Sequence, residues 1–386
     1  MSTPLASMQQ PHDYMIVGAG CSGLSLLMRM LDEPVLYNKR ILLLDRGPKT
    51  VNDRTWCFWE DGAGYFESLV HHHWPRLWVK HEKGALQLKP GGYRYKMIRG
   101  IDFYRYCFAR LRSYNNVHLV YGNVTDIDAE AGRVTVDGFV YEAGTVFSSV
   151  LLQPPQLKPR QLYMLQHFRG WWIETDEDVF DAGEADLMNF RTGQQHGCAF
   201  VYVLPVSSRR ALVEYTLFTQ EELADADYNT GLKLFVQDQL KLEQYRITEV
   251  ENGIIPMTDA HFPRQQGKVV FIGTAGGRTK ASSGYTFQFI QKQSAAMAQS
   301  LAATGGAVVP ADKARFQFYD SVMLRVLHER KVPGGDVFYQ LFKKNPATRI
   351  FRFLDNESSL LQDLALMNST NKTVFVPTAM RVLAGV

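Results

Sequence analysis

Residues 13–24 read DYMIVGAGCSGL, an apolar strand segment that runs directly into a glycine-rich turn and the start of a helix. In a strand–turn–helix unit of this kind, Gly18 permits the tight turn and Gly20 lets the backbone approach a pyrophosphate, with Ala19 between them. Gly23 lets the helix pack closely on the strand. The free N–H groups and the dipole of the helix N-terminus favour a negatively charged ligand. The segment therefore predicts a dinucleotide-binding unit.

A second apolar segment, Ile41 to Leu44, ends at Asp45. In dinucleotide-binding units, an acidic residue about 20 residues beyond the glycines accepts hydrogen bonds from a ribose hydroxyl. Strand, glycines, helix, second strand and acid together are far more specific than the glycines alone. We therefore expect Asp45 to contact a ribose, and a glycine-rich turn without a ligand is the weaker interpretation.

The composition is that of a globular protein: 386 residues, 46% of them hydrophobic, suffice for a core with two lobes. The formal net charge is +3 and no long Lys/Arg run occurs, so nucleic acid is not expected as a partner. Four widely separated cysteines predict neither a metal site nor a disulfide framework, and they fit a reducing cytoplasm. No segment has the roughly 18 apolar residues needed to span a bilayer, and the first 12 residues lack a signal-peptide pattern.

The remaining pattern predicts further strands and helices. Strands are expected at residues 78–95 (two), 117–121, 145–152, 161–174, 186–191, 199–204, 210–218, 247–256 and 268–272. Helices are expected at residues 102–113, 225–240 and 285–303, and residues 311–369 are expected to be mainly helical. Residues 52–67, rich in aromatic and charged side chains, are expected to form a long loop or short helix over the ligand. His71 to His73 are expected in a surface loop, because consecutive histidines point in different directions and no second ligand cluster accompanies them.

Residues 269–277 (VVFIGTAGG) and 282–286 (SSGYT) form a second glycine-rich strand-to-helix junction late in the chain. A simple nicotinamide dehydrogenase does not need one. The pair of motifs resembles the FAD-binding arrangement of flavoproteins of the glutathione-reductase and hydroxylase types. By this resemblance the following residues lie beside the flavin: Gly273, Ala275, Gly284, Tyr285 and Thr286.

These patterns together predict a mixed α/β fold with a Rossmann-like FAD-binding domain, an antiparallel-sheet substrate domain and a helical C-terminal region. The FAD-binding domain is expected to be discontinuous, comprising residues 1–76, 100–152 and 253–310. The substrate domain is expected at residues 77–99 and 153–252, and the helical region at residues 311–386.

The chain as a whole resembles the bacterial flavin-dependent lycopene β-cyclases. The resemblance rests on the two glycine motifs with Asp45, on residues 54–60 (RTWCFWE) and 212–216 (LVEYT), and on the helical tail with LRVL at 324–327 and FRFLD at 351–355. It implies FAD, active when reduced, as the cofactor, and lycopene and other carotenoid polyenes as substrates. NAD(P)H is implied as the reductant, although no separate nicotinamide motif occurs. The central strand carries one acid, Glu214, where relatives more often carry two adjacent acids.

Cyclising the acyclic end of lycopene to a β-ionone ring involves no net redox change. A proton adds to the terminal double bond, the internal olefin attacks the resulting tertiary cation, and a proton then leaves. Glu214 is the candidate acid, because burial in an apolar strand would raise the pKa of its carboxyl. Without the resemblance, a solvent-facing strand residue would explain Glu214 equally well.

The aromatic segment supplies further candidates. Trp56 and Trp59 could stabilise a cation through their π faces, or they could simply pack a domain junction. Glu60 is an alternative proton shuttle and Arg54 a candidate cofactor ligand, although both could be surface charges. Trp171 and Trp172 could line a carotenoid tunnel or serve packing alone.

Other chemistries remain open. The runner-up is a related FAD-dependent monooxygenase or isoprenoid reductase, and a third possibility is a non-catalytic carotenoid-binding flavoprotein. Monooxygenases of this type usually carry an Asp-Gly pair where this chain reads FSSV at residues 147–150, which disfavours oxygenation.

Lycopene lies in the bilayer, so the enzyme must reach a membrane surface. Residues 338–342 and 351–354 combine apolar side chains with nearby Lys343, Lys344, Arg349 and Arg352, a pattern typical of an interfacial element. This pattern predicts a cytoplasmic protein that associates peripherally with the inner face of the membrane. The alternative is a helical subdomain that packs on the core with a basic edge. The sequence makes no prediction of the oligomeric state.

Overall fold

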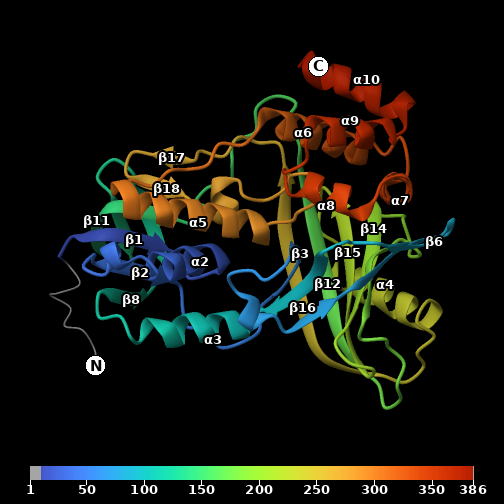
Figure 1. Ribbon diagram of the computed structural model, residues 1–386, viewed down its shortest axis with the longest axis horizontal. Coiled ribbons are helices and arrows are strands. Elements are labelled where there is room, and N and C mark those ends of the chain that lie inside the picture. The colour runs from blue at the N-terminus through green and yellow to red at the C-terminus, as the bar shows by residue number, and fades with distance from the viewer. Residues whose placement is uncertain (1–9, 386) are drawn as a thin grey trace.

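Two large sheets, linked by a small third one, organise the molecule (Figure 1). The computed structural model describes residues 10–385. In the first sheet, five strands run parallel in the order β18-β11-β1-β2-β8, and the short strand β17 pairs antiparallel with β18. Strands β9 and β10 extend from β11 as an antiparallel meander. The strands of this sheet are β1 (His12–Val17), β2 (Ile41–Asp45), β8 (Val117–Tyr121), β9 (Val124–Asp128), β10 (Arg133–Val136), β11 (Phe139–Ser148), β17 (Gln265–Gln266) and β18 (Val269–Phe271).

Both faces of the first sheet are buried, which explains the continuous apolar runs of its strands. Side chains such as Ile16 and Leu43 pack against helices, whereas their neighbours Met15 and Leu42 pack on the side of the meander. The helices over this sheet are α2 (Cys21–Met30), α3 (Gly100–Leu111) and α5 (Phe287–Thr304), and α2 and α5 lie side by side (Figure 1). The predicted strand at 145–152 coincides with the second half of β11 only up to Ser148, where β11 ends.

The second sheet has seven strands in the order β16-β12-β15-β14-β13-β5-β6, all antiparallel except the β13–β5 pair. Its strands are β5 (Arg76–His81), β6 (Gly84–Leu88), β12 (Tyr163–Glu174), β13 (Glu184–Asn189), β14 (Cys198–Pro205), β15 (Arg210–Thr219) and β16 (Arg246–Thr258). Helix α4 (Asp225–Asp238) covers one face, and the C-terminal helices cover the other. The domain boundary expected at residue 252 falls within β16, which continues to Thr258.

A three-stranded antiparallel sheet, in the order β3-β7-β4, links the two lobes. Its strands are β3 (Thr55–Asp61), β4 (His72–Trp74) and β7 (Tyr93–Arg99). The expectation of a loop or helix over residues 52–67 is therefore wrong for residues 55–61. The segment TWCFWED has the aromatic-rich composition of a strand, and pairing with β7 satisfies its backbone. Phe58 packs in the core of the first lobe and Trp59 in that of the second, because consecutive strand residues point to opposite faces.

The histidine run also differs from its prediction. His72 and His73 belong to β4 rather than to a surface loop, because both pair with β7. The His72 Nε2 atom lies 2.7 Å from the Ala182 carbonyl oxygen. Among residues 10–385, no cluster of three or more His, Cys, Asp or Glu side chains has the arrangement of a metal site.

The chain ends in five helices: α6 (Ala314–Glu329), α7 (Gly334–Lys344), α8 (Ala347–Leu354), α9 (Leu360–Asn368) and α10 (Lys372–Leu383). Helices α6 and α7 contact strands of the second sheet, whereas α9 packs on α8 and α10 packs on α6. The apolar side chains of the predicted interfacial segment are mostly buried in this core, including Phe338, Phe342 and Phe351. That segment therefore matches the alternative, a helical subdomain with a basic edge. Within the part of the chain that the structure describes, no helix has the length and apolar character required to cross a bilayer.

Candidate active site

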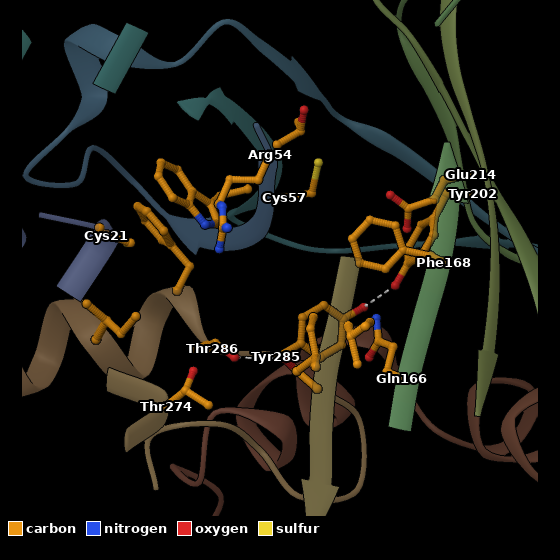
Figure 2. Close-up of a pocket in the computed structure, with 18 of the residues that line it drawn as sticks. Cys21, Arg54, Cys57, Gln166, Phe168, Tyr202, Glu214, Thr274, Tyr285 and Thr286 are labelled. Carbon is orange, nitrogen blue, oxygen red and sulfur yellow. Dashed lines mark hydrogen bonds between the residues drawn. The ribbon is translucent and has the colours of Figure 1, made fainter. Parts of the chain in front are cut away.

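A cavity of about 330 Å³ lies between the first glycine motif, strand β3 and the second sheet (Figure 2). Its first-lobe lining includes Gly20, Ser22, Arg54, Trp56, Ser149, Thr274 and Thr286. Its second-lobe lining includes Gln166, Phe168, Tyr202, Leu212, Glu214 and Ile254. The cavity therefore joins a polar, glycine-rich end to an end that is mainly aromatic and aliphatic.

The three glycines of the first motif differ in what a Cβ atom would meet at their positions. Gly18 has φ +100°, and a Cβ there would lie 2.2 Å from the Ser149 Oγ atom. A Cβ on Gly23 would lie 2.0 Å from the Gly18 carbonyl oxygen, so this glycine permits close packing of α2 on the turn. Gly20 differs, because its backbone is extended (φ −88°) and no atom lies within 4 Å of the position of a Cβ. Nothing within the protein requires a glycine at position 20, whereas a ligand that approaches the backbone would.

Asp45 ends β2 beside this turn. One carboxylate oxygen accepts a 2.6 Å hydrogen bond from the Ala19 backbone N–H, and the other lies 2.9 Å from the Lys49 ammonium. Asp45 thereby fixes the conformation of the turn. It is buried behind the turn and does not line the cavity.

The late glycine motif meets the early one. Residues Gly273–Gly276 form a 3-10 turn, and a Cβ on Gly273 would lie 2.7 Å from the Ser22 Cβ atom. Ala275 is buried beneath this turn, while Thr274 lines the cavity. The Ser22 hydroxyl is buried without a hydrogen-bond partner, as expected of a group that faces a ligand.

Two helix N-termini open on the polar end of the cavity. Helix α2 begins at Cys21 and α5 begins at Phe287, directly after Gly284 (φ +72°), Tyr285 and Thr286. Their unpaired N–H groups and dipoles create a site that favours negative charge. The arrangement suits a phosphate-containing ligand.

The candidate site residues of the aromatic segment, which forms strand β3, differ in whether they line the cavity. Trp56 lines the cavity and packs edge-on against Phe103, with ring centroids 5.1 Å apart. Trp59 does not line it. Its ring is 2% exposed and stacks on Phe351, with centroids 4.9 Å apart.

Glu60 also lies outside the cavity. Its carboxylate is 2.9 Å from the ammonium of Lys96, a cation that is 2% exposed. Glu67 forms a second ion pair with Lys96, at 2.5 Å. Trp171 and Trp172, considered above as tunnel residues, are buried on opposite faces of the second sheet and do not line this cavity.

Glu214 lies on β15 with its side chain in the aromatic end of the cavity (Figure 2). Its Oε1 atom accepts a 3.0 Å hydrogen bond from the Thr216 hydroxyl. A second carboxyl, Glu251 of β16, is hydrogen-bonded to it. Glu251 is 6% exposed, and its Oε2 atom accepts a 2.7 Å hydrogen bond from the Thr55 hydroxyl of β3.

Both carboxyls are held away from bulk water. Burial raises the pKa of Glu214 well above its usual range, and the neighbouring charge of Glu251 raises it further. Burial likewise raises the pKa of Glu251. Two adjacent buried carboxyls cannot readily both ionise, so the pair holds one proton near neutral pH.

Glu251 is the site residue that the sequence prediction missed. Relatives more often carry the second acid beside the first on the same strand, whereas here it comes from β16, 37 positions further along the chain. The available signal was Gly170, a glycine within an aromatic strand, because such a glycine often marks a close approach of other groups. In the sheet register, Gly170 is opposite Glu214 on one side and Glu251 on the other.

Three tyrosines line the cavity together with Glu214. Tyr202 and Tyr285 approach each other with hydroxyl oxygens 3.4 Å apart, and Tyr95 lines the same cavity. Figure 2 shows Tyr285 beneath Tyr202 and Phe168, between Glu214 and the polar end of the cavity. Aromatic faces of this kind can stabilise a nearby cation.

Comparison with solved structures shows the fold. A geranylgeranyl bacteriochlorophyll reductase-like protein from Thermoplasma acidophilum matches with a TM-score of 0.61 at 12% identity, covering 97% of this chain and 99% of that one. HpxO of Klebsiella pneumoniae, solved in complex with FAD, matches with a TM-score of 0.60 at 16% identity, covering 90% of this chain and 98% of that one. The predicted α/β fold of the Rossmann-like, FAD-binding type is therefore confirmed.

Sequence comparison gives the family. A lycopene beta-cyclase of Pantoea ananas is 25% identical over 299 residues, 72% of each chain. A lycopene beta-cyclase of a Paracoccus species is 28% identical over 259 residues, 65% of this chain and 62% of that one. The family model described as "Lycopene cyclase protein" matches residues 13–381. With this match over nearly its whole length, the chain belongs to the lycopene cyclase family.

Proposed function

We propose that the protein is a lycopene β-cyclase, which converts the acyclic ends of lycopene to β-ionone rings, forming β-carotene by way of γ-carotene. The observation that carries this proposal is the carboxyl of Glu214, which lines a cavity with aromatic walls and is hydrogen-bonded to the buried carboxyl of Glu251. A redox-neutral cyclisation needs a proton donor, a proton acceptor and a site that tolerates a cation. The carboxyl pair and the aromatic faces meet these three needs.

In the proposed mechanism, Glu214 carries the proton and Glu251 the negative charge. The O–H bond of Glu214 breaks as its proton forms a C–H bond at the terminal double bond, leaving a tertiary cation on the substrate. The internal olefin then supplies the electron pair of the new ring bond, which moves the cation into the ring. Loss of a ring proton to the carboxyl pair forms the ring double bond and restores the single proton. No electrons are gained or lost.

The same pair stabilises the intermediate electrostatically. After the first transfer, the Glu214 carboxylate faces the carbocation, and the negative charge of the buried Glu251 beside it adds to the stabilisation, because charge interactions are stronger away from bulk water. Thr216 and Thr55 each donate a hydrogen bond to one carboxyl, at 3.0 and 2.7 Å, and so fix the positions of the oxygens. Trp56 and Tyr285 contribute π faces on the side of the glycine motifs.

The polar end of the cavity fits FAD. Gly20 has open space at its Cβ position, the Ser22 hydroxyl lacks a partner, and two helix N-termini converge there. We propose that these groups, with Arg54 and the turn held by Asp45, bind the dinucleotide. When bound and reduced, FAD would supply an electron-rich surface that favours a cationic intermediate. NAD(P)H is proposed as the source of its electrons.

The proposal includes a membrane surface, at a different place from the interfacial segment predicted first. Helices α9 and α10 expose Leu361 (79%), Met380 (62%) and Leu383 (69%). Lys344 lies beside the connection between these helices, because its ammonium donates a hydrogen bond to the Ser369 carbonyl. Exposed apolar groups flanked by basic ones suit an anionic lipid surface, and we propose the inner face of the membrane.

Flotation with liposomes tests this surface. Liposomes in which a quarter of the lipid is anionic should carry the wild-type protein to the top of a density gradient. The double variant Leu361→Glu, Leu383→Glu should remain at the bottom. The exposed Val179→Glu variant, in the connection between β12 and β13, is the matched control and should float. Equal flotation of all three proteins, or none, would contradict docking through α9 and α10.

The test of the enzymatic proposal is expression in a lycopene-accumulating host, followed by pigment analysis. The wild type should convert lycopene to β-carotene. Glu214→Gln should lower turnover about 10²–10⁴-fold, the usual contribution of a general acid. Glu221→Gln, an exposed acid just beyond the end of β15, is the control and should be as active as the wild type. Unchanged lycopene with folded, flavin-loaded wild type would overturn the proposal, and consumption of one reductant per product would instead identify an isoprenoid reductase.

A further inference from the structure

A second cavity, of about 380 Å³, lies among the C-terminal helices and is here called the apolar chamber. Side chains from all five of these helices and from β13 line it. Its walls are nearly all apolar, and they include Leu187, Val322, Phe338, Phe342, Phe353 and Phe375. Lys372, the first residue of α10, is the charged residue in the lining. A wall that is otherwise almost wholly apolar suits a ligand with few polar groups.

The apolar chamber adjoins the active-site cavity at Tyr285, which lines both. The ring of Tyr285 packs edge-on against Trp59, with centroids 4.3 Å apart, and its hydroxyl is 3.4 Å from that of Tyr202. One side chain thus lines both the cavity of Glu214 and the apolar chamber. A chain that occupied both cavities would pass this residue.

The other end of the apolar chamber opens on the surface. Leu364 of α9 and Val376 of α10 line the chamber, although their side chains are 62% and 56% exposed. The chamber therefore opens between α9 and α10, among the exposed apolar residues Leu361, Met380 and Leu383. Helix α10 lies at the edge of the molecule, away from the two glycine motifs (Figure 1).

We propose that the apolar chamber binds the part of a long hydrocarbon substrate that is remote from its reacting end, and that the chain enters between α9 and α10. The proposal rests on the proposed function, because it assigns the occupant as the polyene whose end reaches Glu214. Three observations support it: an apolar lining, a shared wall with the catalytic cavity, and a mouth in the exposed apolar surface. In this assignment the reacting end of the substrate binds beside Glu214, and the remainder of its chain binds in the apolar chamber.

The experiment obstructs the apolar chamber with a large side chain and measures how the enzyme's KM then depends on the length of its substrate. Ala379 lies on α10 and lines the chamber, so Ala379→Trp should obstruct it. The control is Ala384→Trp, at the exposed end of the same helix. In the flavin-loaded protein, Ala379→Trp should raise KM for lycopene at least tenfold. It should leave KM unchanged for a shortened substrate with the same reacting end, and the control should change neither value by more than twofold.

A direct binding measurement uses parinaric acid, an 18-carbon fluorescent polyene, with the same proteins. The wild type and Ala384→Trp should bind it, and Ala379→Trp should bind it at least tenfold more weakly. If Ala379→Trp fails to fold, Val376→Trp at the exposed mouth should show the same pattern. An equal effect on both substrates, or no loss of binding, would overturn the proposal, as would a dimer in solution that buries the mouth.

The experiments distinguish failure of the cyclase proposal from failure of the chamber proposal. If the wild type binds parinaric acid in the apolar chamber but forms no cyclic product, the cyclase proposal falls and the chamber remains. If the wild type cyclises lycopene but Ala379→Trp leaves its chain-length preference unchanged, the chamber proposal falls and the cyclase remains.

Discussion

Glu214 and Glu251 stand on either side of one residue, Gly170, in the sheet register. Strand β12 lies between β15 and β16, so two side chains on its neighbours would normally be separated by the side chain of the middle strand. A Cβ on Gly170 would lie 3.1 Å from the Glu251 Cγ atom and 3.6 Å from the Glu214 Cβ atom. The missing side chain is therefore what allows the two carboxyls to meet above β12.

Gly170→Ala should weaken the contact between the carboxyls. The added methyl group also meets Leu212 at 2.9 Å, so we expect a loss of about 1–2 kcal/mol in the free energy of unfolding. Turnover should fall about tenfold or more with little change in KM, because the carboxyl pair and not the chain-binding surface is disturbed. Gly306→Ala, at an exposed loop position, is the control and should leave turnover unchanged.

Glu251→Gln should shift the pH dependence of turnover. The charge of Glu251 helps to raise the pKa of Glu214, so its removal should lower that pKa. The basic limb of the kcat/KM profile, above which Glu214 is ionised, should therefore move to lower pH. An unchanged basic limb would show that Glu251 does not act on the proton of Glu214.

The same variant should be more stable than the wild type at high pH. A carboxyl whose pKa is raised by folding contributes most below its unfolded value, and this contribution is lost as pH rises through the folded pKa. Since folding raises the pKa of Glu251 from 4.5 to about 7, the wild type should lose this contribution as the pH rises from about 4.5 to about 7. Glu251→Gln should lose less over that range, so its Tm should exceed that of the wild type at pH 9. Calorimetry at several pH values measures this difference.

Two glycines of the first motif should separate folding from cofactor binding. Gly20→Ala should change the stability of the apoprotein by less than about 0.5 kcal/mol, because its backbone is extended and its Cβ meets no protein atom. It should nevertheless lower the amount of FAD retained after purification. Gly18→Ala should destabilise the apoprotein by about 1–3 kcal/mol, because of its positive φ and the Ser149 hydroxyl. Equal FAD content in Gly20→Ala and wild type would contradict this cofactor site.

Glu60→Gln should affect stability rather than chemistry. The variant removes one of two carboxylates that pair with the buried Lys96 ammonium, and should cost about 1–3 kcal/mol of unfolding free energy. Turnover by the folded protein should stay within threefold of the wild type, in contrast to Glu214→Gln. A large loss of turnover without a change in Tm would restore Glu60 as a proton shuttle.

Local patterns in the sequence were sufficient for much of this fold. The strand of residues 117–121 was predicted to the residue, because its ends coincide with turn signals. The glycine motif at residues 18–23 and the acid at the end of β2 also follow from chemistry that is encoded within 35 residues. Glu214 could be proposed because it interrupts an apolar strand.

Features that depend on pairing between distant segments could not be predicted from local sequence patterns. Residues 55–61 form a strand because β7, about 38 residues further on, satisfies their backbone, and no local signal contains that partner. The meeting of Glu251 with Glu214 depends on the register of three strands. The burial of Phe338 and Phe351 likewise depends on the sheet beneath them, since an amphipathic helix looks the same whether it covers a core or a membrane.

The small sheet β3-β7-β4 has one face in each lobe, with Phe58 in the first core and Trp59 in the second. Neither lobe can therefore lose its packing without exposing an aromatic side chain of the other. The two lobes should melt as one cooperative unit in a single calorimetric transition, although the chain passes between them several times. FAD bound at the glycine motifs would then also protect the distant C-terminal helices from proteolysis, by mass action on this shared unfolding equilibrium.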